Sequence, residues 1–429
     1  MSIARMHNDG ARAFGALRPL FRSVGGPVFS TILLLTAVFV LYLFDQRAEK
    51  IFSLPQTAAE ASAEDLVAFF RTSDMLAEGR AAETYVADRF RDGLAAHHQG
   101  MLWLNPPHAF FLVAPLSGAD YGAVKAAVIA LTALSLFLIA RMAGAPPLTI
   151  AALVLSPAAF ASVLVMQSGA LVALGLLAAL RFAATRPIAA GFILAVLTVK
   201  PQYGLMAPVF LAASGHWRAF GSAAGFTALF AALSVAFWGA APWAAFIDSA
   251  AGGAIRDHAG TLHRDWITIA ETVGKLDGDK GARAAAQIAT VAIAAAAVFF
   301  SARRQPKDLA IGLALLASAI ASPSLWVYDW PIVCAGLLML TRVNRLWPAH
   351  LQLLAGLVWI GPLYSLGLLT KESSLIAPVL LALALAAFWL WGERLRGRFE
   401  APSSAPASSQ RPFLFQAPRR RPRDLPRPI

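Results

Sequence analysis

The chain has 429 residues, of which 58% are hydrophobic and only 14% are charged. Soluble globular proteins carry roughly 45–50% apolar and about 25% charged residues, so a soluble protein, a coiled coil and a disordered chain are poor fits. The apolar residues form long blocks, which favours one integral membrane body over two or three soluble domains. The single cysteine, Cys334, excludes an internal disulfide framework and a cysteine-based metal site. The net charge of +12 is informative through its distribution along the chain.

A basic segment, residues 1–26, precedes the first apolar run, which extends from Pro27 to Phe44. This arrangement resembles a secretory signal peptide, but the run is followed by Phe44-Asp-Gln-Arg47 and not by a small-residue cleavage site. Since about 20 apolar residues span a bilayer, we interpret the run as an uncleaved first transmembrane helix.

A polar stretch, 46–104, follows this helix and is predicted to form a large external loop. Apolar residues recur there at near-helical spacing, which indicates an amphipathic helix on the membrane surface: Leu66, Phe69, Phe70 and Leu76. A short apolar segment, His108 to Leu116, is too brief to span a bilayer and is predicted to be re-entrant or tilted.

The remaining apolar runs predict an all-α transmembrane bundle with about twelve spans. After the first span, the others are expected near 121–141, 147–166, 169–184, 187–199, 202–214, 218–240, 285–302, 308–324, 328–341, 347–369 and 374–392. A second polar loop covers 241–284. We found no internal repeat of the kind that marks the pseudo-symmetric halves of many transporters.

The basic residues predict the orientation, because cytoplasmic turns are enriched in Lys and Arg. With both termini cytoplasmic, nearly every inner turn receives a basic residue, and both long polar loops lie outside. The chain therefore divides into a cytoplasmic N-terminus at 1–26, a membrane body at 27–392 and a tail at 393–429. The tail is rich in Arg, Pro and Ser, which predicts disorder near anionic lipid headgroups and gives no support for nucleic-acid binding.

Carboxylates in the first external loop are candidates for acid–base chemistry. Glu64 and Asp65 begin the amphipathic segment, and Asp74 lies nine residues further on. A carboxylate held by a surface helix could act as a general base toward a lipid-linked substrate. Acids at a helix N-terminus are also favoured by the helix dipole, so a structural role stays open.

Three further polar groups interrupt apolar runs at the same outer face. Gln167 with Ser168 could bind a sugar or a phosphate, or could cap a helix. Lys200, followed by Gln202, could contact a phosphate; a Lys between apolar stretches is otherwise costly unless it reaches the interface. Tyr328 and Asp329 end another interruption, where Asp329 could pair with Lys200, act as a second acid or cap the next span.

Other polar clusters are weaker candidates. His258 and His263 lie five residues apart, which is not the four-residue spacing of a helical zinc pair, so a loop or headgroup contact is expected. His97 and His98 receive the same interpretation. Asp277-Gly-Asp279 has the form of a divalent-ion pair, but Asp-Gly is most often a turn. The chain has no P-loop and no dinucleotide fingerprint, so an ATP-driven pump is unsupported.

Taken in order, these clusters resemble the polytopic bacterial glycosyltransferases of family 87, of the GT-C type. The matching stretches extend over about 45–330: Asp65-Leu-Val-Ala-Phe-Phe70, Trp103-Leu-Asn-Pro-Pro-His108, Gln167-Ser-Gly169, Leu197-Thr-Val-Lys-Pro-Gln-Tyr-Gly204 and Ala321-Ser-Pro-Ser-Leu-Trp-Val-Tyr-Asp329. The chain departs from the family where relatives commonly have Gly-Gln-Asn-Gly, a Tyr before the Pro pair and an aromatic at the Ser324 position. These departures bear on the substrate more than on the fold.

The resemblance implies a transferase in the cell envelope that moves a hexose, typically mannose, from a polyprenyl-phosphate sugar to a glycolipid or glycan outside the membrane. An acid of the first external loop is then the general base, which by position is Asp65, with Glu64 and Asp74 as alternatives. Lys200 and Gln202 would contact the donor phosphate, while Gln167 and Asp329 would orient the sugar; Tyr328, His258 and His263 are further substrate-binding candidates. The scheme needs no cofactor and no metal, although it is compatible with a divalent ion.

Two other functions remain as alternatives at this point. One is a transporter or flippase for lipid-linked sugars, which would place its polar groups near the middle of the membrane between broken helices. The other is a non-catalytic subunit of an envelope-assembly complex. The sequence does not name the sugar, the acceptor or the linkage.

Overall fold

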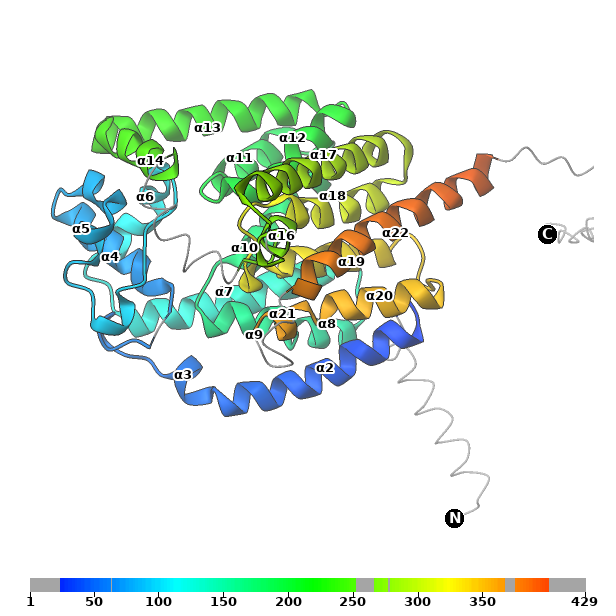
Figure 1. Cartoon of the computed structure of the whole chain (residues 1–429), viewed down its shortest axis with the longest axis horizontal. Helices are drawn as coiled ribbons and strands as arrows, with labels where there is room; N and C mark the ends of the chain where they lie inside the picture. Colours follow the sequence, from blue (N-terminus) through cyan, green and yellow to red (C-terminus); the bar gives the residue numbers. More distant parts are fainter. Residues whose placement is uncertain (1–23, 63, 252–265, 277, 367–374, 401–429) are drawn as a thin grey trace, which may run out of the picture.

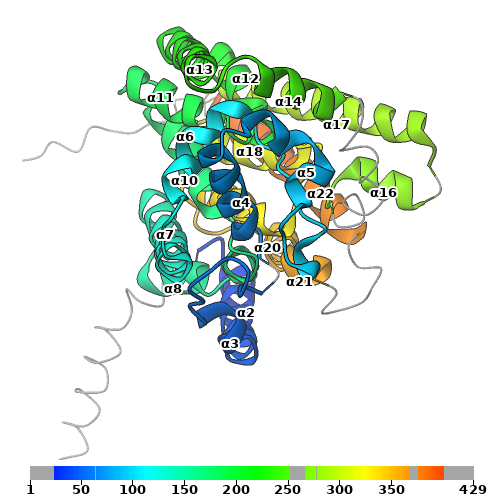
Figure 2. The same ribbon diagram turned by 90° about the vertical axis from the view of Figure 1, so that its left-hand side faces the viewer.

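The computed structural model describes residues 24–62, 64–251, 266–276, 278–366 and 375–400, and within these ranges every regular element is helical. The first element, α2 (Pro27–Gln46), runs along one side of the molecule. It is followed by short helices that gather at one end (Figures 1 and 2): α3 (Ala48–Phe52), α4 (Leu66–Ala77), η1 (Ala81–Tyr85), α5 (Ala87–Arg91), η2 (Ala96–His98), η3 (Pro107–Ala109), α6 (Phe110–Val113) and η4 (Ala114–Leu116).

The middle of the chain contributes long outer helices and shorter inner ones. These are α7 (Tyr121–Met142), α8 (Pro147–Val154), α9 (Pro157–Leu164), α10 (Gly169–Phe182), α11 (Pro187–Leu197), η5 (Pro201–Tyr203), α12 (Met206–Ala213), α13 (Trp217–Trp238) and α14 (Ala241–Ala251). Several begin with proline, whose fixed φ and missing N–H suit the first turn of a helix.

The last part completes the bundle. Its elements are α16 (Ile269–Lys275), α17 (Lys280–Arg304), α18 (Lys307–Ala321), η7 (Val327–Asp329), α19 (Pro331–Thr341), α20 (Ala349–Trp359), α21 (Gly361–Ser365) and α22 (Ile376–Glu400). Every residue of α19 is buried, and so is every residue of α18 from Leu309 onward, so these two helices form the centre of the core.

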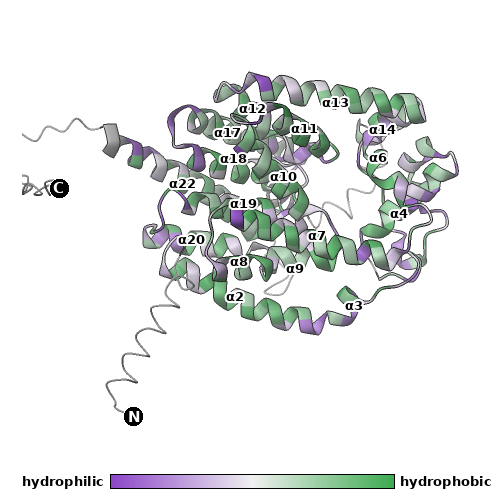
Figure 3. Cartoon of the chain, turned by 180° about the vertical axis from the view of Figure 1, so that it is seen from behind, coloured by the Kyte–Doolittle hydropathy of each residue, from purple (hydrophilic) through white to green (hydrophobic). Residues whose placement is uncertain are grey.

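Hydrophobic residues predominate along α2, α7 and α13 (Figure 3). Val38 of α2 is 67% exposed and Phe237 of α13 is 70% exposed, which is the surface expected of helices that face lipid. In the described residues, six helical segments are long and apolar enough to cross a membrane: Pro27–Gln46, Tyr121–Met142, Pro147–Leu164, Trp217–Trp238, Lys280–Arg304 and Ile376–Arg396. The chain is therefore a multi-pass membrane protein with an all-helical body.

The other predicted spans are helical but shorter than a bilayer requires, so about twelve full spans are not shown. The lengths are 8 residues for α12 and 15 for α18. Proline is the main physical reason, because it ends one helix and begins the next. Pro362 follows the break between α20 and α21, which divides the predicted span 347–369, whereas the break before Pro157 still leaves Pro147–Leu164 long enough to cross. The segment predicted to be re-entrant consists of η3, α6 and η4.

The two ends of the molecule differ. α3, α4, α5, α6 and α14 lie at one end, whereas the start of α2 and the end of α22 lie at the other (Figure 1). The first polar loop is thus separated by the length of the bundle from the points where the described chain begins and ends.

Candidate active site

Four segments that are distant in sequence meet near the N-terminus of α4. They contribute Asp65 from the start of α4, Gln167 from the turn before α10, Lys200 from the turn before η5, and Asp329 from η7. The backbone N–H of Asp65 donates to the carbonyl of Val165 at 3.0 Å, which fixes the start of α4 beside the Gln167 turn.

A continuous chain of polar contacts joins these four side chains. Gln167 Nε2 donates to Asp65 Oδ2 at 2.8 Å, and Lys200 Nζ donates to Gln167 Oε1 at 3.0 Å. Lys200 Nζ also lies 3.9 Å from Asp329 Oδ1. The two neighbours of Gln167 determine the orientation of its amide, since a carboxylate only accepts and an ammonium only donates.

The ring of Tyr328 lies over the Lys200 ammonium. Its Nζ lies 5.2 Å from the centre of the Tyr328 ring, within the range of a cation–π interaction. Trp326 stacks on Tyr328 with ring centres 5.7 Å apart and an interplanar angle of 9°. Lys200 is 8% exposed, so the charge is held in a largely water-excluded site where electrostatic interactions are strong.

Asp329 is fully buried and has unequal oxygens. Oδ2 accepts from the hydroxyl of Tyr203 and from the backbone N–H of Trp326. Oδ1 has no hydrogen-bond partner in the described part of the chain and faces Lys200 at 3.9 Å. Asp329 therefore stabilises its own turn with one oxygen and provides a counter-charge for Lys200 with the other.

The close approach of two turns requires glycine at position 169. A Cβ atom at Gly169 would lie 1.8 Å from the carbonyl oxygen of Tyr328, which no side chain can accept. Met166, just before Gln167, adopts a left-handed conformation with φ of 53°, which is uncommon for a residue with a side chain. The turn that carries Gln167 is thus packed tightly against the turn that carries Asp329.

Burial raises the pKa of Asp65 above its ordinary value, because removal from water disfavours the charged carboxylate. The hydrogen bond from Gln167 and the charge of Lys200 act in the opposite direction and favour the carboxylate. A carboxyl with a raised pKa that remains partly accessible has the properties expected of a general base.

The neighbouring acid, Glu64, lies in a different and closed network. Lys125 Nζ donates to Glu64 Oε1 at 2.7 Å, and the hydroxyl of Tyr121 donates to Oε2 at 3.0 Å. Ser62 donates to Oε1 as well, at 2.8 Å. Glu64 is 1% exposed with both oxygens occupied, so it could accept a substrate proton only after these contacts break.

The other predicted site residues lie apart from this cluster or outside the described residues. Asp74 is exposed and nine residues along α4, about 14 Å along the helix axis from Asp65. Gln202 is half-buried in η5, in the same turn as Tyr203. His258 and His263 lie outside the described residues.

The weaker metal candidates have structural partners. Asp279 caps α17 by accepting from the N–H of Ala282 at 2.7 Å, whereas Asp277 lies outside the described residues. His97 and His98 both direct Nε2 at the carbonyl of Ala61. Among the described residues no group of three or more His, Cys, Asp or Glu side chains could hold a metal ion.

Sequence reasoning missed Lys125, Tyr121 and Tyr203. Lys125 had a usable signal, since a single Lys within an otherwise apolar span requires a partner. The two tyrosines had none, because a tyrosine near a membrane surface is more often an interfacial anchor than a donor to a buried acid.

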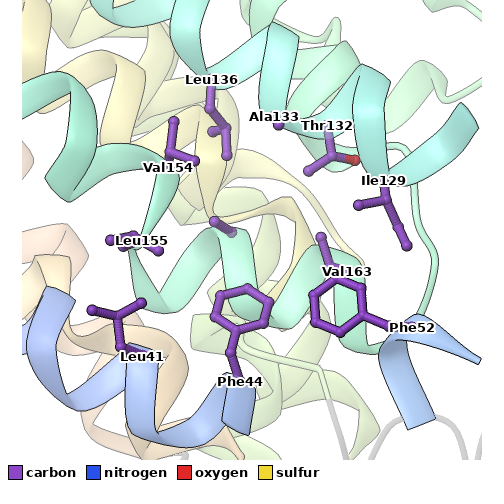
Figure 4. Close-up of a pocket in the computed structure, with 11 residues that line it drawn as sticks. Leu41, Phe44, Phe52, Ile129, Thr132, Ala133, Leu136, Val154, Leu155 and Val163 are labelled. Carbon is purple, nitrogen blue, oxygen red and sulfur yellow. The ribbon is translucent and has the colours of Figure 1, made fainter. Parts of the chain in front are cut away.

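An apolar cavity of about 290 Å³ lies apart from the residues of this cluster, none of which lines it (Figure 4). α2, α3, α7, α8 and α9 form its walls, with Phe44, Leu136 and Val163 among the lining side chains. Val163 is two residues from Val165, whose carbonyl binds the N–H of Asp65.

The sequence matches the model of a known family, described as glycosyltransferase family 87, over residues 103–327, just over half of the chain. The matched region includes Gln167 and Lys200, ends just before Tyr328 and begins after Asp65. No curated protein and no solved structure matches the chain.

Proposed function

The chain belongs to glycosyltransferase family 87 and is a membrane glycosyltransferase, and from its site we propose that it transfers a hexose, typically mannose, from a polyprenyl-phosphate sugar to a glycolipid or glycan. The observation that carries this proposal is the contact chain from Asp65 through Gln167 to Lys200. It places a carboxylate and an ammonium at opposite ends of one amide, where the first can act as a base and the second can stabilise a leaving phosphate.

In the proposed reaction Asp65 is the general base. Its Oδ2 accepts from Gln167, and the acceptor hydroxyl is expected to approach Oδ1. As the acceptor oxygen bonds to the anomeric carbon, its proton moves to the Asp65 carboxylate. The bond between the anomeric carbon and the phosphate oxygen breaks, and polyprenyl phosphate leaves with the electron pair. A single displacement of this kind inverts the anomeric centre.

Lys200 is proposed to stabilise the leaving phosphate. Charge develops on the bridging oxygen as the bond breaks, and a fixed ammonium in a water-excluded site lowers the energy of that state. Gln167 and the Tyr328 ring hold Lys200, and Asp329 compensates its charge before the donor binds. Because Asp329 is fully buried, we propose that it acts through Lys200. The half-buried Gln202 would contact the donor directly, whereas Gln167, whose amide is held by Asp65 and Lys200, would do so only by exchanging one of these contacts.

The proposed topology places this chemistry on the external face, with both termini cytoplasmic and the short helices completing about twelve crossings. The arrangement in Figure 1 supports it, since α4 lies at the end opposite the start of α2 and the end of α22. A transporter for lipid-linked sugars and a non-catalytic envelope subunit remain the competing hypotheses, because the same cluster could hold a headgroup without reacting.

The test is an assay of purified protein with polyprenyl-phosphate mannose and a membrane extract, scored for labelled product. Asp65→Asn should lower the rate of transfer by about 10²–10⁴-fold, the usual contribution of a positioned base. Asp74→Asn is the matched control on the same helix and should retain activity, since Asp74 is exposed and distant.

Full activity in Asp65→Asn would refute the site assignment. Absence of product with every lipid-phosphate sugar, from a protein that is folded and inserted, would favour transport or a non-catalytic role.

A further inference from the structure

The α17–α22 seam, defined here as the groove between α17 and α22 above α18, contains two hollows. An apolar groove of about 510 Å³ is lined by Ile293 and Phe300 of α17, by Ala382 and Trp389 of α22 and by Ile320 of α18. Further along both helices a second hollow of about 480 Å³ is lined by Arg304 and Arg396. The two helices run in the same direction and both pack on α18 (Figure 1).

The distances along the seam match one leaflet of a bilayer. From Ile293 to Arg304 is eleven residues, or about 16 Å at 1.5 Å per residue. From Ala382 to Arg396 is fourteen residues, or about 21 Å. One leaflet of the hydrocarbon core is about 15 Å thick, so an acyl chain in the apolar groove would bring its headgroup to the level of the two arginines.

The second hollow is basic and polar. The Arg304 guanidinium lies 4.8 Å from the centre of the Phe300 ring. Arg304 lines the second hollow and Phe300 lines the apolar groove, so the two hollows adjoin at this contact. Arg396 is held by Glu393 at 3.1 Å, and Glu393 also accepts from Gln305 Nε2 at 2.9 Å. With Asn344 and Gln305 in the lining, the hollow offers two positive charges, one compensated by Glu393, and several polar contacts for a phosphodiester.

The location of the basic hollow favours a lipid as the occupant. It lies at the end of the bundle where α2 begins and α22 ends, which the proposed topology places at the cytoplasmic leaflet (Figure 1). Basic pockets between transmembrane helices on that side are typical sites for anionic lipid headgroups.

From this amphipathic shape we infer that the α17–α22 seam binds one anionic glycerophospholipid, with its phosphate between Arg304 and Arg396 and an acyl chain along the apolar groove. The site is separate from the Asp65–Lys200 cluster and needs no assumption about the transfer reaction. It rests only on the proposed membrane orientation.

The test uses the full-length protein in nanodiscs of phosphatidylcholine alone or mixed with phosphatidylglycerol, followed by native mass spectrometry of retained lipid. The wild type should retain one phosphatidylglycerol in preference to phosphatidylcholine. Arg304→Gln and Arg396→Gln should each lower its retention by roughly five-fold, since one basic residue contributes about that factor to anionic-lipid attraction.

Two matched controls separate this site from general surface charge and from folding. Arg303 lies over Phe299 at 5.3 Å and lines neither hollow, so Arg303→Gln should leave retention unchanged. Ala297→Phe fills the apolar groove with both arginines intact and should remove the lipid, whereas Ala292→Phe on the exposed face of α17 should not. Thermal unfolding of each variant is measured too, and lipid retention is compared only among variants that are as stable as the wild type.

The inference is overturned if phosphatidylcholine is retained equally, or if Arg303→Gln and Arg304→Gln have the same effect. Displacement of the lipid by millimolar inorganic phosphate would identify a phosphate site instead. Displacement by polyprenyl phosphate would assign the groove to the sugar donor.

Discussion

Two lysines of this protein lie among apolar helices beside a carboxylate, and their surroundings are opposite. Lys125 and Glu64 form a fully buried pair at 2.7 Å, with the other oxygen of Glu64 bound by Tyr121. Lys200 lies 3.9 Å from Asp329 and is shared with an amide and a ring. The first pair is closed to substrate, whereas the second retains an acceptor oxygen without a hydrogen-bond partner in the described residues.

This difference separates an anchor from a candidate site. Lys125 also donates to the carbonyl of Lys50 at 2.9 Å, so one ammonium connects α7, the end of α3 and the loop before α4. That network fixes the start of α4 and hence the position of Asp65. Lys200 instead faces Oδ1 of Asp329, which has no hydrogen-bond partner in the described residues. A substrate that binds Lys200 therefore has few protein hydrogen bonds to replace.

The largest expected effect is on stability and concerns the buried pair formed by Lys125 and Glu64. Lys125→Met leaves Glu64 buried without its counter-charge, which costs about 3–5 kcal/mol in comparable pairs. The double variant Glu64→Gln/Lys125→Met removes both charges and should recover most of that loss. Thermal unfolding in detergent measures both, and equal destabilisation of single and double variants would contradict the pairing.

The next largest effect is on catalysis and concerns the pair formed by Lys200 and Asp329. Lys200→Met should lower kcat/KM by about 10²–10³-fold, the usual loss when one group that stabilises developing charge is removed. Lys200→Met also leaves Asp329 buried without its counter-charge, so activity is compared per folded molecule to separate loss of catalysis from loss of stability. Transfer kinetics and unfolding of Lys200→Met and Lys125→Met, measured side by side, test the contrast directly.

A smaller effect is expected where the two turns meet. Gly169→Ala adds a Cβ that would overlap the carbonyl of Tyr328, so the Asp329 turn has to move. Overpacking of this kind costs about 1–3 kcal/mol. Activity should fall together with stability, and Gly221→Ala is the control, because a Cβ at Gly221 meets no atom within 4 Å.

The smallest effect is a shift in pH dependence. Asp65 must be ionised to accept a proton, and burial raises its pKa, so activity should be lost on acidification at a pH above the ordinary carboxyl range. Gln167 donates to the carboxylate and lowers that pKa, so Gln167→Leu should move the acid limb of kcat/KM to higher pH. If the acid limb of kcat/KM is unchanged in Gln167→Leu, a group other than Asp65 controls the loss of activity at low pH.

Much of the helical fold was predictable from composition and periodicity. The apolar runs located the long helices, and the spacing of Leu66, Phe69 and Phe70 predicted α4. The number of full spans was not predictable, because Gly361-Pro362 interrupts a run that hydropathy alone treats as continuous, and helices such as α12, with 8 residues, are shorter than the apolar runs that contain them. Hydropathy measures how apolar a segment is, whereas proline decides where its helix ends.

The candidate site was predictable in part. Asp65, Gln167, Lys200 and Asp329 stand out because each is polar at the edge of an apolar run, and the structure brings all four together. Their pairing could not be derived, since Gln167 and Asp65 are 102 residues apart. The exclusion of Glu64 from the cluster depends on Lys125, which is 61 residues away.

The central claim is that Asp65 performs chemistry while the adjacent Glu64 only positions it. The most direct test is the rate of sugar transfer per folded molecule in Asp65→Asn and in Glu64→Gln/Lys125→Met. We expect a loss of about 10²–10⁴-fold in the first and a much smaller loss in the second, in which the start of α4 is less well fixed but the base is retained. A fully active Asp65→Asn beside an inactive double variant would contradict the claim.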